Sequence, residues 1–573
     1  MISHNSPISG IACWQDSYVA TAGYDNQVIL WDQASQRALG RVNHDHLANQ
    51  CAFSPDGKHL VTASSDHTAR LWTVPSLRLV AVMADHDDDV EMAAFHPSKP
   101  LIATASRDHL VRVFDFTGEC VQRFEGHAAD VISVEWANDA DELISSSDDG
   151  TIRRWSLESG LEISVLDMAG VETDTVAIGC EGTIFAGNDD GEITIIAADG
   201  ARTVVSAHDA GIKRLVVSVD LRLLVSLSYD RTLKIWDLTT DGLSLVSVAE
   251  FPSEVWPRSC AFAGQTNLVF GSFGRTYKVF NYRENVWTST VGDTLGVNAV
   301  IELTSRPGGK PGETLAVGDA GIVWASNARM DDLRPRAEMG SLCNFFGRLD
   351  DLVVTGGQMG RLFDAESGRL LHQHRSPLNC ATAITVDGRS LLVVGSYTGE
   401  AIVLESRPEL RSVGDLKLLD NAIKGVASNG NMLFAVGADA SAVWYDMATH
   451  TETCRMDKAH DKIINGCAAL ADEGFVSISR DLTMKIWTEP GHGHTVTTPH
   501  ANSIKCVAVD RSRRFIATGG YHGTIAVYDT KTGRWPQVVR PTMSGVSCLS
   551  WSDRSNTFLA SSYDGKLYDV APV

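Results

Sequence analysis

The chain has 573 residues, more than a single hydrophobic core usually organises, so more than one domain is expected. Its net charge of −22 and isoelectric point near 5.2 disfavour general binding to nucleic-acid phosphates and favour basic partners. No stretch approaches the roughly 18 apolar residues that a membrane-spanning helix needs, so no membrane insertion is expected.

A short motif that ends in Trp-Asp, or in a variant of it, recurs fourteen times at a period of about 41 residues. Two clear copies are residues 25–32 and 230–237. The aromatic or apolar end points are Trp31, Trp72, Phe114, Trp155, Ile196, Trp236, Phe280, Trp324, Phe363, Leu404, Tyr445, Trp487, Tyr528 and Val570. A fixed period of this length is typical of the blades of a β-propeller.

The third repeat shows how each unit is built. Apolar alternation and β-branched residues predict strands over residues 90–95, 101–105, 111–115 and 120–124. The segments between them are rich in Gly, Pro, Asp and Ser, which favour tight turns. Each repeat is therefore predicted to form one four-stranded blade.

A histidine precedes the turn aspartate of many repeats by 21 or 22 residues. The pairs are His4 and Asp25, His44 and Asp66, His86 and Asp108, His127 and Asp149, His208 and Asp230, and His460 and Asp481. Independent catalytic histidines would not keep this spacing, whereas a repeated buried hydrogen bond would. We expect both partners to be kept or lost together, because a buried polar group without its partner is costly.

With these pairs and end points, the whole chain resembles the WD-repeat family. The resemblance implies that the histidine bonds the turn aspartate and that a strand Ser or Thr and the strand Trp complete the network. In the fourth repeat these residues map onto His127, Ser147, Asp149 and Trp155. The fifth repeat keeps Asp190 without a histidine, repeats eight to ten lack both residues, and the thirteenth has His500 and His522 without an aspartate.

The predicted fold class is all-β, with two seven-bladed β-propellers built from fourteen WD-type repeats. We expect the first ring in residues 1–290 and a less regular second ring in residues 291–573. Residues 305–313 are predicted to form a turn-rich loop inserted in the eighth repeat. Few residues flank the first and last repeats, so one blade should have three strands. An alternative places the first repeat in the second ring, and an open blade edge could accept a strand from a partner.

Eleven cysteines give an odd number, and seven lie in the first predicted strand of a repeat. These are Cys13, Cys51, Cys260, Cys380, Cys467, Cys506 and Cys548. A disulfide framework would not repeat one strand position, so we expect small buried thiols in a reducing compartment. Residues 1–7 lack the features of a signal peptide, which also indicates the cytoplasm.

No catalytic motif is found in the sequence, and neither a cofactor nor a metal is expected. Residues 491–494 with His500 do not match a zinc pattern and are interpreted as a polar loop before the first strand of the thirteenth repeat. Residues 87–89 are all aspartate, but no further calcium ligands follow at loop spacing. The channel-facing strands are interpreted as carrying Val, Ala, Cys and Ser rather than clustered Glu, Asp and His, which disfavours an enzyme acting at the channel.

In WD-repeat proteins the residue before the turn aspartate often points to the face that binds peptides. The candidates here are Tyr24, Arg107, Asp148, Asp189, Tyr229 and Phe273 in the first ring and Tyr397, Arg480, Tyr521 and Tyr563 in the second. Tyr and Arg are enriched at interface hot spots, and turns alone would favour Gly, Asn, Asp and Ser. The alternative is that these side chains only cover the ends of the blades.

The function predicted from the sequence is a non-enzymatic scaffold that binds protein partners, including basic or peptide-like segments, in a cytosolic complex. One alternative is an actin-interacting double propeller that promotes filament disassembly, for which the sequence offers the architecture alone. The other is an enzyme with chemistry at the channel, for which no site is found.

Overall fold

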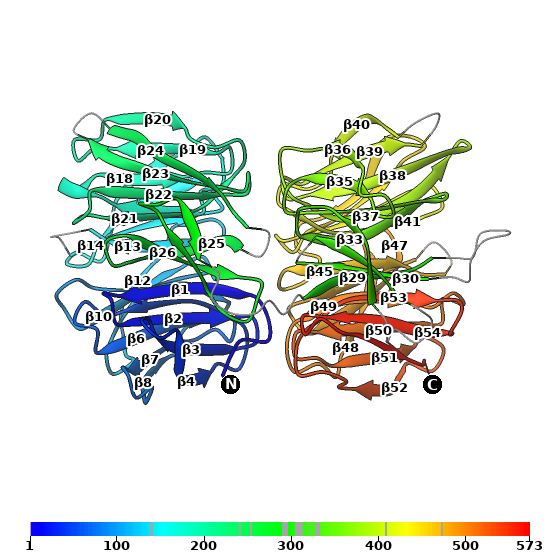
Figure 1. Cartoon of the computed structure of the whole chain (residues 1–573), viewed down its shortest axis with the longest axis horizontal. Coiled ribbons are helices and arrows are strands. Elements are labelled where there is room, and N and C mark those ends of the chain that lie inside the picture. Colours follow the sequence, from blue (N-terminus) through cyan, green and yellow to red (C-terminus); the bar gives the residue numbers. More distant parts are fainter. Residues whose placement is uncertain are drawn as a thin grey trace. The chain divides into compact units, whose positions relative to one another are not determined.

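A computed structural model describes residues 2–137, 141–239, 242–252, 255–288, 296–303, 313–319, 321–326, 333–406, 410–471 and 474–572. Within these ranges the regular elements are β-strands and one short 3₁₀ helix, Cys180–Gly182 (Figure 1). No helix of the described residues is long and apolar enough to cross a membrane.

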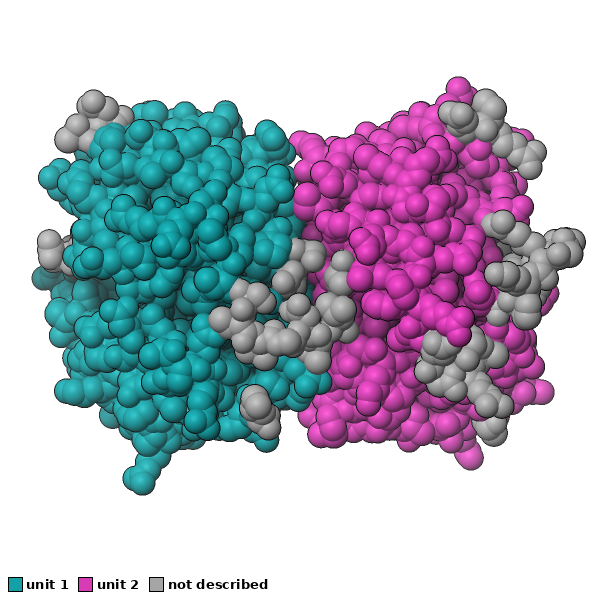
Figure 2. Space-filling view, in the orientation of Figure 1, with its two compact units in different colours: residues 1–293 teal, residues 294–573 magenta. Residues whose placement is uncertain are grey.

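The chain divides into two compact units, Met1–Asp293 and Thr294–Val573 (Figure 2). The predicted boundary between residues 290 and 291 lies in residues 289–295, outside the described residues. The predicted insertion at residues 305–313 also lies outside them, except for its last residue.

The first unit holds strands β1 to β28. Their bounds are β1 (Ile8–Trp14), β2 (Tyr18–Gly23), β3 (Gln27–Asp32), β4 (Arg37–Asn43), β5 (Ala48–Phe53), β6 (His59–Ser64), β7 (Ala69–Thr73), β8 (Leu79–Met83), β9 (Val90–Phe95), β10 (Leu101–Ser106), β11 (Val111–Asp115), β12 (Cys120–Phe124), β13 (Val131–Trp136), β14 (Glu142–Ser147), β15 (Thr151–Ser156), β16 (Glu162–Asp167), β17 (Thr175–Ile178), β18 (Ile184–Gly187), β19 (Glu192–Ile196), β20 (Arg202–Ser206), β21 (Ile212–Ser218), β22 (Leu223–Ser228), β23 (Thr232–Thr239), β24 (Gly242–Glu250), β25 (Val255–Ala263), β26 (Asn267–Ser272), β27 (Lys278–Asn281) and β28 (Val286–Thr288).

The second unit holds strands β29 to β55. Their bounds are β29 (Val297–Glu302), β30 (Thr314–Gly318), β31 (Ile322–Ser326), β32 (Leu333–Glu338), β33 (Cys343–Leu349), β34 (Leu352–Gly357), β35 (Arg361–Asp364), β36 (Leu370–Gln373), β37 (Leu378–Val386), β38 (Arg389–Ser396), β39 (Glu400–Glu405), β40 (Arg411–Lys417), β41 (Ile423–Asn429), β42 (Met432–Gly437), β43 (Ala442–Asp446), β44 (Thr451–Met456), β45 (Ile464–Ala469), β46 (Phe475–Ser479), β47 (Thr483–Glu489), β48 (His492–Thr497), β49 (Ile504–Val509), β50 (Phe515–Gly520), β51 (Ile525–Asp529), β52 (Arg534–Val539), β53 (Val546–Ser552), β54 (Thr557–Ser562) and β55 (Leu567–Val570).

Consecutive strands pair antiparallel in sheets of four, which we number as blades 1 to 14 in chain order. In the first unit the innermost strands β1, β5, β9, β13, β17, β21 and β25 contact one another in sequence, and β25 contacts β1 again. The innermost strands of the second unit, β29 to β53, close in the same way. The described chain therefore forms two rings of seven blades, which confirms the predicted fold class.

Blade 14 differs from the other blades because its described sheet has three strands, β53, β54 and β55. This is the three-stranded blade that the sequence predicted. The alternative position for the first repeat is wrong: Ile11 and Trp31 of blade 1 pack with Val269 and Tyr277 of blade 7, inside the first unit. The outer edge of β55 pairs with no described strand.

The core lies between neighbouring blades. The repeat end points fall in the third strand of every blade, where Phe114, for example, is fully buried against the residues of blade 2. Burial of such a side chain contributes about 1.5–3 kcal/mol. The fourth strand alternates exposed and half-buried residues, as in β4, because only one of its faces meets a neighbour.

The six predicted His–Asp pairs are hydrogen-bonded, with Nδ1-to-carboxylate distances of 2.8–2.9 Å. In the fourth blade the Trp155 Nε1–H donates to Ser145 Oγ at 2.9 Å, and that hydroxyl lies 2.8 Å from His127 Nε2. Because His127 Nδ1 lies 2.9 Å from Asp149, one chain of bonds joins the second and third strands of the blade, and the turn between them, to the loop before the first strand.

The structure corrects one residue of this network. The sequence mapped Ser147 onto the hydroxyl position, but Ser145 occupies it. Ser147 ends β14, where its Oγ accepts the Asp149 N–H at 3.1 Å and stabilises the turn. The two serines point to the same face of the strand, since side chains alternate, so the spacing alone does not distinguish them.

Blade 13 has an incomplete network that makes a testable prediction. His500 Nε2 lies 2.8 Å from Thr518 Oγ1, but His522 occupies the turn position that holds aspartate elsewhere. Burial lowers the pKa of His500 to about 4. An unfolded histidine has a pKa near ~6.5, so the unfolded state binds more protons between these values and acidification destabilises the fold.

We expect His522→Asp to supply the missing carboxylate, raise the pKa of His500 and stabilise the second unit by about 1 kcal/mol at neutral pH. The gain should grow between pH 7 and pH 5, because the folded protein then binds the proton more readily. Urea unfolding at both pH values measures it. The neutral variant His522→Asn is the control, and an equal gain from both variants would contradict the prediction.

Candidate functional site

The predicted candidates other than Phe273 share one backbone contact, as do the residues at the same turn position of four further blades, and this contact places them at one end of each ring. The N–H of the candidate donates to a carbonyl in the loop before the first strand of the same blade, at 2.9–3.3 Å. The pairs are Tyr24 with Pro7, Ser65 with Leu47, Arg107 with Asp89, Asp148 with Asp130, Asp189 with Glu172, Tyr229 with Gly211, Asp319 with Gly296, Gln358 with Leu342, Tyr397 with Pro377, Ala438 with Ala422, Arg480 with Ile463, Tyr521 with Ser503 and Tyr563 with Gly545. We call this end of a ring its turn face.

Arg107 is not a free side chain on the first turn face. Its Nε donates to Glu91 Oε1 at 2.5 Å, and its Nη1 donates to Asp130. The Glu91 side chain is 3% exposed, and Arg258 donates to its other oxygen at 2.9 Å. Burial opposes ionisation of Glu91, but the charges of Arg107 and Arg258 outweigh it and hold the pKa of that carboxyl below its usual value.

The contact between Arg258 and Glu91 crosses the inside of the ring. Glu91 lies in blade 3 and Arg258 in blade 7, which are not neighbours in the cyclic order. Arg214 of blade 6 makes a second crossing, from its Nη1 to the Met92 sulfur at 3.5 Å. These side chains connect opposite blades near the ring axis.

Aromatic rings cover the part of the first turn face around blades 1 and 7. Tyr24 is 5% exposed and meets Trp256 edge to face, with ring centroids 5.3 Å apart. Trp256 stacks on Phe273 at 5.2 Å, and the Arg258 guanidinium lies 5.6 Å from the Trp256 ring. Tyr24 and Phe273 therefore pack within the ring as well as lying at its turn face.

Blades 5 and 6 form a second charged group on this face. Lys213 forms ion pairs with Asp174 and Asp189, and its ammonium lies 5.1 Å from the centre of the Tyr229 ring. Burial raises the pKa of Asp189 to about 6, although the Lys213 charge opposes the shift. Asp189 and Tyr229 are both predicted candidates, and both contact Lys213.

Asp148 lies between these two groups. Its carboxylate makes no hydrogen bond with any described residue. Burial, followed by the nearby carboxylates of Glu172, Asp130 and Asp174, raises the pKa of Asp148 well above its usual value. The Arg107 charge opposes the shift, so the first turn face holds a carboxylate with no donor among the described residues, beside three carboxylates and one guanidinium.

The second turn face combines tyrosines with cations. The rings of Tyr521 and Tyr563 stack with centroids 6.2 Å apart, and the Lys424 ammonium lies 4.3 Å from the centre of the Tyr397 ring. Lys505 lies within electrostatic reach of Tyr521, Tyr397 and Arg480. The four predicted candidates of the second ring thus gather around Lys505 and Lys424.

A comparison with protein families agrees with this geometry. The model described as "WD domain, G-beta repeat" matches residues 1–32, 39–73, 77–115, 118–156, 201–237, 493–529 and 538–568. Six blades also contain the full His–Asp bond at the predicted positions. The chain contains WD repeats. Blade 12 is such a repeat although the model does not match it, because His460, Ser477, Asp481 and Trp487 form the complete network.

Several curated proteins are similar to parts of this WD-repeat chain. "Target of rapamycin complex subunit wat1" of Schizosaccharomyces pombe is 27% identical over 241 residues, 40% of this chain and 76% of that protein. "U3 small nucleolar RNA-associated protein 15 homolog" of Xenopus laevis is 29% identical over 177 residues, 30% of this chain and 33% of that protein. "Guanine nucleotide-binding protein subunit beta" of Zea mays is 28% identical over 249 residues, 38% of this chain and 66% of that protein.

Sequence reasoning missed the charged residues of the innermost strands. The sequence interpretation assigned Val, Ala, Cys and Ser to these strands, but in the first WD-repeat ring they also carry Glu91, Glu135, Lys213, Arg214 and Arg258. The available signal was a charged residue inside an otherwise apolar strand, which is rare without a partner. Two of the contacts, from Arg258 to Glu91 and from Arg214 to Met92, cross the ring, so these pairings had no local signal.

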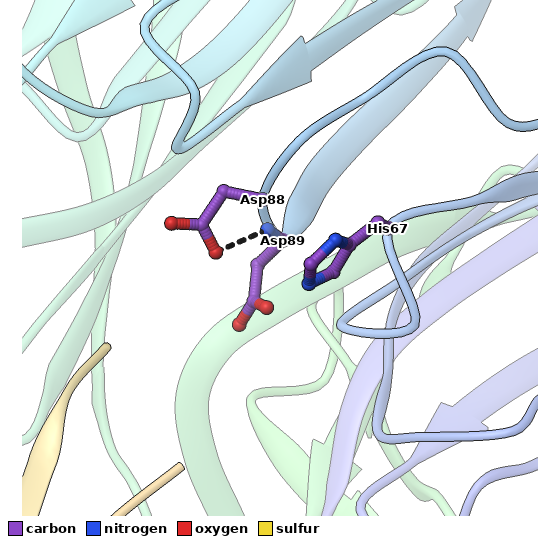
Figure 3. Close-up of side chains that lie close together, drawn as sticks. All are labelled: His67, Asp88 and Asp89. Atoms are coloured by element: carbon purple, nitrogen blue, oxygen red, sulfur yellow. Dashed lines mark hydrogen bonds between the residues drawn. The ribbon is translucent and has the colours of Figure 1, made fainter. Parts of the chain in front are cut away.

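Two histidine-containing segments bear on metal binding. His67, Asp88 and Asp89 offer three ligand atoms within 4.8 Å of one another, and the Asp89 N–H donates to Asp88 Oδ1 at 2.7 Å (Figure 3). This set lies beside the first turn face and has one histidine and two carboxylates. Residues 492–494, predicted to be in a loop, instead begin the outer strand β48, so that interpretation is wrong. His492 and His494 are two positions apart, so both exposed side chains lie on one face of this outer strand.

Proposed function

We propose that this WD-repeat protein is a non-enzymatic scaffold that binds a basic segment of a protein partner at its first turn face. The observation that supports this proposal most is Asp148, a carboxylate without a described hydrogen-bond donor among three further carboxylates. A partly buried carboxylate without a hydrogen-bond donor and beside like charges destabilises a fold, and such groups are kept where a ligand uses them. A lysine or arginine of the partner would supply the missing donor.

The surroundings of Asp148 fit a peptide. The same turn face carries aromatic residues, with Tyr229 against Lys213 and the stacked pair Trp256 and Phe273 at blade 7, and these offer apolar contact to a peptide. Aromatic anchors beside a desolvated charge are typical of interface hot spots. The negative net charge of the whole protein, −22, would also steer a basic partner toward it.

The relatives named as subunits of complexes support the scaffold class, and the free thiols, three of them buried and the others half-buried, support a reducing cytoplasmic location. The free edge of β55 is a second surface for a partner, where a strand could add to blade 14. Specific observations favour neither actin binding nor chemistry at the ring axis.

Affinity purification of the tagged protein from its native host tests the proposal. We expect a stoichiometric protein partner that is retained by the unmodified chain and lost from Asp148→Asn. The substitution keeps the size of the side chain and removes an unfavourable like charge, so the unfolding midpoint should stay the same or rise. Mass spectrometry gives the stoichiometry, and isothermal calorimetry with the purified partner should show a loss of about tenfold or more.

Asp220→Asn is the matched control, because Asp220 is exposed in the turn between β21 and β22, at the opposite end of the ring. It makes the same change of charge in the same ring and should keep the partner. A partner held equally by both variants would place binding elsewhere. The absence of any stoichiometric partner would argue against a scaffold.

A further inference from the structure

In several blades the side chain at one bulge position donates a hydrogen bond to the neighbouring blade. We call this bond an inter-blade tie. The register of the first strand shifts at its second residue, and that residue points to the turn face. In six blades its side chain donates to the main-chain carbonyl at the start of the next first strand. The pairs are Ser9 to Ala48, Asn49 to Val90, Asn298 to Cys343, Asn379 to Ile423, Asn465 to Ile504 and Ser547 to Val297.

Charged residues replace these ties in four blades. In the first ring Glu91 and Lys213 use the position for ion pairs with Arg107 and Asp174. In the second ring the position holds Lys424 and Lys505. Lys505 makes neither a tie to blade 14 nor an ion pair with any described residue. Its ammonium therefore has no structural role that the fold explains.

The surroundings of Lys505 are positive. Among the turn and bulge positions of the second ring, the charged residues are Lys424, Arg480, Lys505 and one carboxylate, Asp319. The Asp319 carboxylate accepts hydrogen bonds from the Gly296 N–H at 3.0 Å and from the Asn298 side-chain amide at 2.9 Å. These positions thus hold three cations and one carboxylate that already has donors, in a protein whose net charge is −22.

Tyrosines complete this face. Tyr397 belongs to blade 10 and Tyr521 to blade 13, yet both lie within electrostatic reach of Lys505. Phenolic hydroxyls donate hydrogen bonds to anions, and their rings offer apolar contact. The face is suited to a carboxylate carried on a peptide.

We propose that the second turn face binds an acidic, Asp- or Glu-rich segment of a protein partner, with Lys505 as the cation that pairs with its carboxylate. This inference rests on the scaffold function proposed above and extends it to a second site of opposite charge. The two rings would then hold a basic segment and an acidic segment at separate faces of one chain.

Fluorescence anisotropy with the full chain tests the inference. The probes are a labelled decapeptide of alternating glutamate and serine and the same peptide with glutamine in place of glutamate. We expect Lys505→Gln to weaken binding of the acidic peptide about tenfold or more and to abolish its preference over the neutral peptide. Higher salt should also weaken the binding, because the attraction is electrostatic.

Lys531→Gln is the matched control, since Lys531 is exposed in the turn between β51 and β52, at the opposite end of blade 13. It should change the affinity less than about twofold. Lys505→Arg keeps the charge and should retain binding, which separates charge from folding. Circular dichroism and the unfolding midpoint monitor the fold of each variant.

Equal binding of the acidic peptide by the unmodified chain and by Lys505→Gln would overturn the inference, and so would equal binding of the neutral peptide. Neither result bears on the binding site proposed at the first turn face. A partner lost on Asp148→Asn in the absence of acidic-peptide binding would leave the scaffold function standing and remove only the second site.

Discussion

A Glu91→Ala variant is expected to lose about 3–5 kcal/mol of unfolding free energy in the first unit. Glu91 is 3% exposed and accepts from Arg107 at 2.5 Å and from Arg258 at 2.9 Å. Its removal leaves two desolvated guanidinium groups in place. Arg107 keeps Asp130, whereas Arg258 loses its one ion pair with a described carboxylate and keeps the face of Trp256, 5.6 Å away. Calorimetric or urea unfolding measures the loss.

The pH dependence of this loss has a defined sign. The pKa of Glu91 is lower in the folded protein than its ordinary value of 4.5. The stabilisation it contributes is therefore complete above that value and disappears as the pH falls through the folded pKa. The difference between the unmodified chain and the variant should shrink accordingly in acid.

Glu142→Ala provides the comparison. Glu142 pairs with Arg154 at 2.6 Å, but the two side chains are 27% and 34% exposed. Half-exposed pairs contribute only about 0–1 kcal/mol. Equal losses from Glu91→Ala and Glu142→Ala would show that the contact across the ring is no stronger than a surface pair.

An Asp108→Asn variant is expected to lose about 2–4 kcal/mol. Asp108 accepts from His86 at 2.9 Å, from Arg112 at 2.6 Å and from the N–H groups of Asp87 and Leu110 at 3.1 Å. Burial opposes its charge, but these donors hold the pKa of Asp108 well below the ordinary value. An amide keeps one acceptor oxygen and loses the charge, so His86 and Arg112 lose their ionic partner. Unfolding in urea measures the change.

Asp190→Asn tests the same substitution at the same turn position without the network. Asp190 is exposed, and blade 5 has no histidine to pair with it. The expected change lies within about 0.5 kcal/mol of zero. A comparable loss at both positions would mean that the turn itself, rather than the His–Asp bond, stabilises the blade.

The repeated features of the fold were predictable because they are local. Trp155, Asp149 and His127 lie within 28 positions of one another and recur with the period, so both the blades and the His–Asp bonds follow from spacing. The strands predicted for the third repeat agree with β9, β11 and β12 and differ from β10 by one residue. The sequence does not distinguish Ser145 from Ser147, because both side chains point to the same face of the strand and only their distances from the histidine ring differ.

The positions of the turn-face residues were predictable from the sequence, but the contacts of their side chains were not. The sequence placed Arg107 and Tyr24 at one end of the ring and suggested exposed anchors. In the structure Arg107 is tied to Glu91, and Tyr24 packs on Trp256. Contacts such as Glu91 with Arg258 join residues 167 positions apart. No periodic pattern encodes them, because they depend on which blades face each other across the ring.

Ring closure has a consequence for the order of the chain. Every blade is one continuous segment, and β1 meets β25 by packing and by the bond from the His4 N–H to the Arg275 carbonyl. In the described chain no two blades of the first ring share a sheet, and neighbouring blades meet by packing. The junction between blades 1 and 7 therefore differs from the other six junctions only in that no peptide segment connects the two blades. Moving the chain's starting point to another blade boundary would break no hydrogen-bonded sheet. The order in which blades follow one another, more than the place where the chain begins, specifies each ring.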